Sequence, residues 1–393
     1  MGNKRGANVF RPVYGDRGWT LWPEHEDLSA ELSNLLAASQ EGGATVSECL
    51  YAVSRIDPTD PASWFRSWKA LADTNRARGD AAHRSNHLPT ARSNWLRAVS
   101  YYRAAAVVFD EDCSEKCAAL TLMRRCAHDY VAHLAPPGAV VEIPWLEDLP
   151  LEGYFLPAQR FGRAPAVLCI GEPDHRKEEF LCKVQRYARD RGLAVLAVDV
   201  LGPGSGIPLH GIVGWRDLHS AVGRCLDYLR SLSCIDPDRL AVFADSPKSS
   251  FVARGLLADS SVAAAVCDGG IWELKEALFL RQQRCPEPLP RDRLDDLVAT
   301  GAIGRLDCPT LITLGERGWL DPDDVKDIVA RAAAAGRDIT LRSFPESETA
   351  AAQNHADNPT LSNEVIFDWI ESRLRSDHVD DPPPVDIVAA ELC

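Results

Sequence analysis

The chain has 393 residues, of which 46% are hydrophobic, so it is long enough to bury the core of one large domain or of two ordinary ones. Its formal net charge of −14 repels a phosphate backbone and argues against a nucleic-acid partner, whereas a small neutral or cationic ligand suits such a field. There is neither a secretory signal pattern nor an apolar run of about 18 residues, so we expect no membrane span. The 12 scattered cysteines contain no CxxC pair and predict free thiols in the cytoplasm.

Residues 1–136 are predicted to form a helical N-terminal unit. Trp64, Trp68 and Leu71 follow one another at i, i+4 and i+7, which is the spacing of one helix face. A second aromatic stripe of the same kind runs through residues 95–102. We interpret both stripes as packing surfaces and not as a cofactor site.

Residues 137–376 are predicted to form an α/β domain. Short apolar runs predict strands at Val140–Trp145, Leu151–Leu156, Ala166–Ile170, Ala194–Val198, Leu240–Ala244, Ala263–Cys267, Thr310–Leu314 and Thr340–Phe344. Helix patterns lie at Lys177–Arg191, Gly214–Leu232, Pro247–Ala258, Pro322–Ala335 and Ser362–Arg375. An opening hairpin followed by strand–helix repeats with continuous apolar strands indicates a mostly parallel, eight-stranded sheet covered on both faces.

Two segments depart from this alternation. Residues 271–305 are predicted to be a cap insertion over the carboxyl edge of the sheet, where ligands bind in such folds. Residues 377–393 form a Pro-rich tail.

A candidate nucleophile follows the strand Leu240–Ala244. The turn "ADSPK" places Ser246 at the centre of a G-x-S-x-G nucleophile elbow, although both glycines of that motif are absent. His355 lies after the last predicted strand and before the final helix, where the general base of such a fold is found. Ser246 and His355 are therefore the predicted catalytic pair.

The third member of a Ser-His-acid triad is less clear from the residues. Its usual place, three residues beyond the first glycine of "LGERGWLDPDD", is Gly318. Asp321 or Glu316 could reach His355 from neighbouring positions. We prefer Asp321, although an Asp-Pro pair at the start of a helix is also explained by capping.

Further polar residues lie near the predicted site. Asp174 and Asp268 follow strands and are either structural or substrate-facing, and Glu172 could supply a backbone N–H to an oxyanion hole. Lys248 is either a side-chain donor in that site or an exposed lysine at the start of a helix. No cluster of His, Cys or carboxylate residues has the spacing of a metal site, so we predict neither a metal nor another cofactor.

Four motifs in the right order carry a family resemblance that runs from about Trp64 to Arg375: "WLRAVSYYRAA", "GEPDHRKEEF", "VLAVDVLGPGSG" and the strand that precedes Ser246. The chain resembles the FrsA-like α/β-hydrolases, which include 2,6-dihydroxypseudooxynicotine hydrolase and fungal polyketide chain-shortening hydrolases. The resemblance implies an α/β-hydrolase fold with a helical lid, no cofactor, and hydrolysis of C–C or ester bonds in small aromatic or polyketide-like molecules. It matches Ser246 to the nucleophile and His355 to the base, and it suggests a homodimer by analogy.

Pro247 is an electrostatic departure from this family. The residue after the nucleophile normally donates its backbone N–H to the oxyanion, and proline has none. Loss of one such donor costs about 2.7–4 kcal/mol. Three explanations follow. A side chain such as Lys248 replaces the donor, or the enzyme is a lyase that eliminates a carboxylate such as acetate, or the protein binds a ligand without turning it over.

Overall fold

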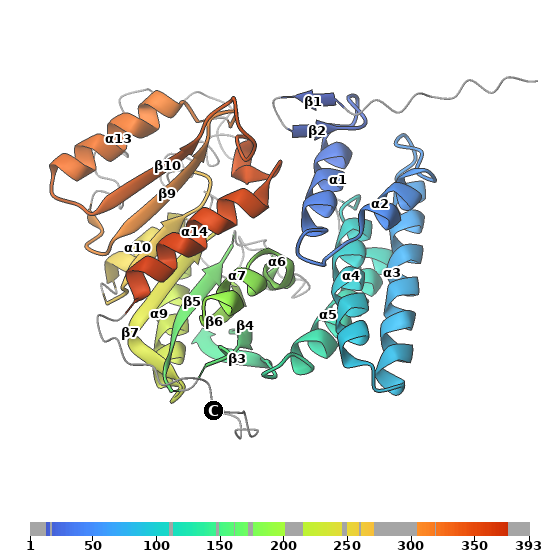
Figure 1. Cartoon of the computed structure of the whole chain (residues 1–393), viewed down its shortest axis with the longest axis horizontal. Helices are drawn as coiled ribbons and strands as arrows, with labels where there is room; N and C mark the ends of the chain where they lie inside the picture. The colour runs from blue at the N-terminus through green and yellow to red at the C-terminus, as the bar shows by residue number, and fades with distance from the viewer. Residues whose placement is uncertain are drawn as a thin grey trace, which may run out of the picture.

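The computed structural model describes residues 13–15, 18–109, 113–146, 149–160, 162–171, 176–200, 215–245, 250–258, 261–270, 305–318 and 320–375. Within these ranges a helical bundle lies beside a layered α/β part (Figure 1). The bundle part contains the hairpin β1 (Val13–Gly15) and β2 (Gly18–Thr20), followed by α1 (Glu26–Ala38), α2 (Val46–Val53), α3 (Pro61–Arg84), α4 (Leu88–Ala106) and α5 (Ser114–Ala132).

Aromatic side chains hold the bundle together. Trp64 and Trp68 on α3 are completely buried, and the Trp68 ring stacks on Tyr101 of α4 with 5.8 Å between ring centroids. Asp60 caps α3 by accepting a hydrogen bond from the Ala62 N–H, and Pro61 fits the first helical turn because its missing N–H would have no helical partner. The predicted helix faces are therefore core surfaces.

The α/β part contains one eight-stranded sheet. Its strands are β3 (Ala139–Leu146), β4 (Leu149–Leu156), β5 (Ala164–Ile170), β6 (Ala194–Asp199), β7 (Ile235–Ala244), β8 (Ala264–Cys267), β9 (Thr310–Gly315) and β10 (Ile339–Phe344). They are arranged in the order β10-β9-β8-β7-β5-β6-β4-β3. The pairs from β10 to β6 are parallel, while β4 and β3 are antiparallel additions at one edge. This confirms the predicted fold class.

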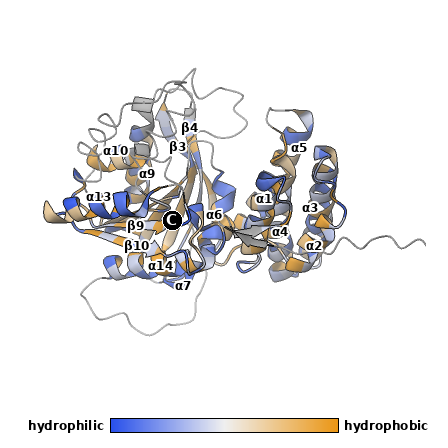
Figure 2. Cartoon of the chain, turned by 90° about the horizontal axis from the view of Figure 1, so that it is seen from above, coloured by the Kyte–Doolittle hydropathy of each residue, from blue (hydrophilic) through white to orange (hydrophobic). Residues whose placement is uncertain are grey.

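Helices cover both faces of the sheet. They are α6 (Lys177–Lys183), α7 (Gln185–Asp190), α9 (Trp215–Ser231), α10 (Ser250–Ala258), α13 (Pro322–Ala334) and α14 (Pro359–Leu374). Alternate residues of the central strands enter different cores: Val167 packs in the layer with α14, and Leu168 in the layer with α9. Figure 2 shows the hydrophobic strands between helices whose outer surfaces are more hydrophilic.

The predicted strands and helices are confirmed within the described ranges, with two differences. The helix predicted at Lys177–Arg191 is divided into α6 and α7 at Val184, whose ψ of −24° at φ −122° interrupts the helix. The small β1–β2 hairpin was not predicted. The elbow (246–249), most of the cap insertion (271–304) and the tail (377–393) lie outside the described residues.

The sheet determines where chemistry can occur. Because β5, β7, β8 and β9 run parallel as neighbours, their carboxyl ends meet at one edge. The residues that leave these strands there are Gly171, Asp245, Asp268 and Glu316. No helix in the described ranges is both long and apolar enough to cross a membrane.

Candidate active site

A group of mostly buried polar and charged side chains lies at this edge, which we call the carboxyl-edge cluster: Lys183, Asp245, Asp268, Thr313 and His355. Lys183 Nζ lies 2.6 Å from Asp245 Oδ1 and 3.1 Å from Asp268 Oδ2, so one ammonium bridges two carboxylates. Asp245 directly follows β7 and directly precedes Ser246. The cluster is therefore adjacent along the chain to the predicted nucleophile.

His355 is completely buried, and both of its ring nitrogens have partners. Its Nδ1 lies 2.6 Å from the carbonyl oxygen of Ala350, and its Nε2 lies 2.8 Å from Thr313 Oγ1 and 3.3 Å from Asp268 Oδ1. A carbonyl only accepts, so Nδ1 is the donor in the first of these bonds. The Thr313 hydroxyl donates to Asp268 Oδ1 at 2.7 Å. The His355 ring is thus held on both sides, by a carbonyl oxygen at Nδ1 and by Thr313 and Asp268 at Nε2.

The charges of the cluster support one another. Burial alone would raise the pKa of Asp268, but Lys183 and His355 lower that pKa well below its ordinary value. Burial would lower the pKa of Lys183, and Asp245 and Asp268 together raise it above its ordinary value. Asp268 is consequently ionised and Lys183 is charged at neutral pH.

The carboxylate that faces His355 belongs to Asp268 and not to either residue expected from the sequence. Asp321 is the N-cap of α13, where its side chain accepts a hydrogen bond from the Asp323 N–H at 2.9 Å. Glu316 accepts a hydrogen bond from Ser343 Oγ at 2.8 Å. Capping, the alternative weighed for the Asp-Pro pair, thus accounts for Asp321.

The loop that carries His355 presses against the end of β9. A Cβ atom at Gly315 would collide with the carbonyl oxygen of Ala352, and one at Gly318 would lie 2.6 Å from Gln353 Oε1. The space beside Gly318, where the acid usually stands, is therefore filled by the Gln353 side chain of the His355 loop. An aspartate at 318 would require the Gln353 side chain to move.

Three residues of this loop that are not glycine have left-handed backbone conformations. Ala350 has φ 65°, Asn354 has φ 55° and His355 has φ 56°. Each costs on the order of 1 kcal/mol or more, and such strain gathers at functional sites. The loop turns sharply at these residues, and the turn places the His355 ring against Thr313 and Asp268.

Several residues predicted from the sequence lie outside the described ranges. These are Ser246, Lys248, Glu172 and Asp174, together with Pro247. The structure places their chain neighbours Asp245 and Gly171 at the carboxyl edge. The roles of these residues stay predictions.

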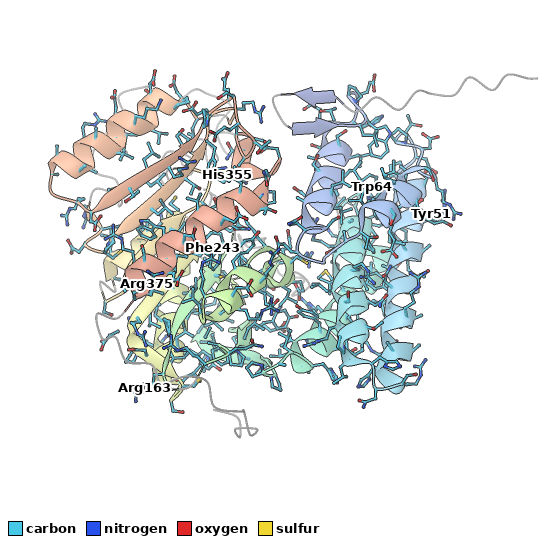
Figure 3. All side chains as sticks on the ribbon, viewed as in Figure 1. Tyr51, Trp64, Arg163, Phe243, His355 and Arg375 are labelled. Atoms are coloured by element: carbon cyan, nitrogen blue, oxygen red, sulfur yellow. The ribbon has the colours of Figure 1, made fainter. Side chains whose placement is uncertain are left out.

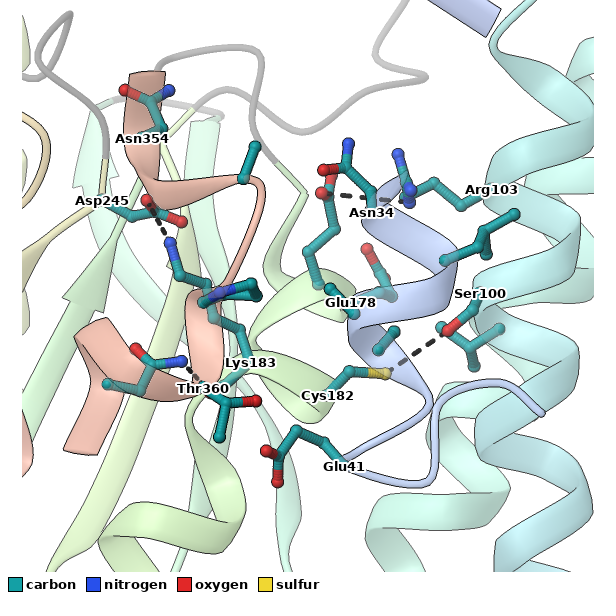
Figure 4. A pocket seen from close by; sticks show the side chains of 18 of the residues that line it. Asn34, Glu41, Ser100, Arg103, Glu178, Cys182, Lys183, Asp245, Asn354 and Thr360 are labelled. Carbon is teal, nitrogen blue, oxygen red and sulfur yellow. Dashed lines mark hydrogen bonds and ion pairs between the residues drawn. The ribbon is translucent and has the colours of Figure 1, made fainter. Parts of the chain in front are cut away.

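A cavity of about 320 Å³ lies between the bundle and the α/β part (Figure 4). Its walls come from α1, α4, α6, α14, the end of β7 and the His355 loop. The polar and charged side chains that line it are Asn34, Glu41, Ser100, Arg103, Glu178, Glu179, Cys182, Lys183, Asp245, Gln353, Asn354, Thr360 and Asn363. Figure 3 shows His355 in the α/β part and Trp64 in the bundle, on opposite sides of this junction.

Lys183 and Thr313 are site residues that the sequence reasoning missed. Lys183 is one of several charged residues in "RKEEFLCK", and no local pattern distinguishes it. Thr313 alternates with apolar residues in a buried strand and has the signature of a packed position. Asp268 did carry a signal, because it directly follows a strand of the parallel sheet.

Comparisons with known proteins agree with this architecture. No family model matches the chain. Hydrolyase poxO of Penicillium oxalicum is 29% identical over 321 residues, covering 79% of this chain and 70% of that protein. The 20-hydroxy-prefusarin hydrolase FUS2 of Gibberella moniliformis is 26% identical over 364 residues, covering 86% of this chain and 85% of that protein.

A solved structure repeats the fold over nearly the whole chain. The 2,6-dihydroxy-pseudo-oxynicotine hydrolase superposes with a TM-score of 0.67 at 19% identity, covering 86% of this chain and 95% of that one. The chain has the α/β-hydrolase fold, and it resembles these hydrolases in sequence. The family resemblance expected from its four motifs is thereby confirmed.

In an α/β-hydrolase the strand before the nucleophile ends at the carboxyl edge and leads into a helix. Here β7 is that strand and α10 is that helix. The usual acid follows the strand equivalent to β9, whereas the carboxylate beside His355 follows β8. The carboxylate closest to His355 therefore lies one strand away from the usual position of the acid.

Proposed function

We propose that this α/β-hydrolase is an enzyme that acts on a small metabolite in the cavity between its bundle and its α/β part. Ser246 is the nucleophile, His355 the base and Asp268 the carboxylate that holds His355. The bond that breaks is an ester bond or a C–C bond beside a ketone. The observation that carries the proposal is the buried Asp268–His355 contact of 3.3 Å, one strand away from the residue that precedes Ser246.

The chemistry follows from these groups. Ser246 Oγ attacks the substrate carbonyl while His355 accepts the hydroxyl proton, and His355 then returns that proton to the leaving alcohol or carbon. Water repeats the sequence on the acyl-serine and releases the acid. For this reaction Nε2 must exchange its Thr313 partner for the Ser246 hydroxyl. Asp268 stabilises the imidazolium that forms in each half-reaction.

The bundle is proposed to act as a lid over this site. Its helices α1 and α4 supply one wall of the cavity, and α6, α14 and the end of β7 supply the opposite wall. Exclusion of water from such a site strengthens every charge interaction within it. A small molecule held there is shielded from solvent by the bundle.

Elimination of a carboxylate is the second candidate. Pro247 removes the usual oxyanion donor, and proton abstraction needs only a base, an acid and an enclosed site. The Penicillium relative is named a hydrolyase, while the Gibberella relative is named a hydrolase. Lyase and hydrolase names thus both occur among the relatives.

One substrate distinguishes the two reactions: the acetate ester of a β-hydroxy aryl ketone, incubated in water enriched in the heavy oxygen isotope. Hydrolysis yields the hydroxy ketone and acetate that carries one heavy oxygen atom. Elimination removes the proton next to the ketone, breaks the C–O bond and yields an enone with unlabelled acetate. We expect labelled acetate that Ser246→Ala no longer forms. Unlabelled acetate would establish the lyase, and a folded protein that yields neither product would contradict the proposed enzyme.

A further inference from the structure

Two buried side chains in the cavity wall each have one oxygen atom that accepts no hydrogen bond from the described residues. Glu178 is 1% exposed, its Oε1 accepts a hydrogen bond from the Tyr154 hydroxyl at 2.9 Å, and its Oε2 has no hydrogen-bond partner among the described residues. Asn363 is also 1% exposed; its Nδ2 donates to the Lys183 carbonyl at 3.0 Å, and its Oδ1 likewise has no such partner. Both residues line the cavity.

Both unused atoms can only accept. A buried acceptor without a partner costs about 1–3 kcal/mol, and more when it is charged. A ligand that donates a hydrogen bond to either oxygen recovers this free energy, whereas a ligand that brings another acceptor adds repulsion. The chemistry of the wall therefore selects for donors.

The charge around Glu178 does not oppose this preference. Lys177 Nζ lies 3.4 Å from Glu178 Oε1, and it also lies 2.6 Å from Glu152 and 2.9 Å from Asp199. Arg176 interacts with Glu178 as well, and Arg124 interacts with Glu152. Glu178 thus shares its cation Lys177 with two other carboxylates, and its Oε2 has no hydrogen-bond partner among the described residues.

The cations on the cavity wall are already paired. Arg103 lies 2.5 Å from Glu31 and 3.9 Å from Glu179, and Lys183 bridges Asp245 and Asp268. An anionic ligand would compete with these partners for the same charges. At Glu178 the cation Lys177 lies 3.4 Å from Oε1, and Oε2 is left for a cationic ligand.

We propose that the cavity is specific for ligands that present a hydrogen-bond donor, above all an ammonium group and next a hydroxyl, to Glu178 and Asn363, and that it rejects carboxylates. This inference deepens the proposed function, because it assumes that the substrate occupies this cavity. It concerns binding alone and can be tested without turnover.

Three probes with one skeleton provide the test: phenylpropylamine, phenylpropanol and phenylpropanoate. Their affinities are measured by ligand-observed NMR at millimolar concentration. Wild-type protein is expected to bind the amine about tenfold or more tightly than the acid, with the alcohol between them. Glu178→Gln should remove most of the advantage of the amine over the alcohol.

Glu179→Gln is the matched control, because it removes the same charge from the same cavity at a residue that pairs with Arg103. It should retain the preference for the amine. Asn363→Leu leaves Lys177 and its three carboxylate partners unchanged. It should weaken the binding of the alcohol and of the amine to the same extent, and it replaces Glu178→Gln in the test if that variant does not fold. Equal affinities, tighter binding of the acid, no binding of any probe, or an unchanged preference in a folded Glu178→Gln variant would overturn the inference.

The two proposals fail separately. The probes are also measured on Ser246→Ala, whose cavity keeps Glu178 and Asn363. A preference for the amine in a protein that shows no serine chemistry would remove the proposed function and leave the specificity standing. Serine chemistry without a preference for the amine would remove the specificity and leave the proposed function standing.

Discussion

Asp268 has two partners, the partly buried cation Lys183 and the buried ring of His355. Removing such a carboxylate leaves the cation with less compensation than before. Asp268 therefore contributes to the stability of the carboxyl-edge cluster and also orients the His355 ring. These two effects can be measured independently.

Asp268→Asn is expected to slow the reaction of Ser246 with a fluorophosphonate by about a hundredfold or more, because the His355 imidazolium loses its carboxylate. The variant should lose about 3 kcal/mol or less of unfolding free energy, since Lys183 retains Asp245. Asp321→Asn is the control: asparagine caps a helix as well as aspartate, so both quantities should stay close to wild type. An unaffected labelling rate in folded Asp268→Asn would exclude Asp268 as the acid.

Asp199 predicts a pH effect on stability. Burial raises the pKa of Asp199 to about 6 from its ordinary value of 3.8, despite the lowering effect of Lys177. The folded protein binds this proton more tightly than the unfolded chain does, so the contribution is full below pH 3.8 and is lost as the pH rises through about 6. Asp199→Asn mimics the protonated form. Its unfolding free energy, minus that of wild type, should therefore increase between pH 4 and pH 7, as urea titrations would show; a difference that is flat or falls would contradict this assignment.

Sequence order predicts the pair Ser246 and His355, but it does not predict that Asp268 lies beside His355. Ser246 and His355 stand out because each lies at a fixed place between a strand and a helix. Sequence order favours Asp321 over Glu316 as the acid, and it predicts only that Asp268 is structural or substrate-facing. The contact between Asp268 and His355 depends on how β8 and β9 are aligned and on the turn at Ala350–His355, and neither is encoded in a local pattern.

At the level of elements, the loop from Ala350 to His355 and the end of β9 form one unit. The loop backbone lies directly over Gly315, where no side chain would fit. The strands themselves were predictable, because continuous apolar runs are typical of a sheet covered on both faces. The division of the helix at Val184 was not, because no glycine or proline marks it.

Gly315→Ala should lower the unfolding free energy by about 1–3 kcal/mol, because its Cβ would overlap the Ala352 carbonyl oxygen and push the His355 loop away. Gly223 lies within α9 with nothing inside 4 Å of a Cβ built there. Gly223→Ala should therefore be neutral or stabilise by up to about 1 kcal/mol. Guanidinium unfolding of both variants tests the pair, and a Gly315→Ala protein as stable as wild type would show that the loop is not packed against β9.

At the level of the whole molecule, the cavity depends on two units whose contacts join residues far apart in the chain. Ser100 Oγ on α4 lies 3.4 Å from Cys182 Sγ on α6, across the junction. A helical unit and an α/β domain could each be predicted from spacing. The packing of the two units against each other could not be predicted, because it depends on the shapes of their surfaces and not on the periodicity of their hydrophobic residues.

Cys182 reports on this junction. Burial raises the pKa of its thiol to about 11. Because the thiolate is the reactive form, iodoacetamide at pH 8 should modify Cys182 about a hundredfold more slowly than an ordinary thiol. The exposed Cys117 is the internal reference in the same peptide map. Equal rates at the two cysteines would mean that the bundle does not cover Cys182.

The most direct test of the proposed site is the intact mass of the protein after incubation with a fluorophosphonate, with wild type, Ser246→Ala and Asp268→Asn compared in parallel. We predict one adduct on wild type, none on Ser246→Ala and slow formation on Asp268→Asn. Such a result would mean that Ser246 is activated through His355 and Asp268 despite Pro247. A folded wild-type protein that stays unlabelled, or an adduct that persists in Ser246→Ala, would contradict the account.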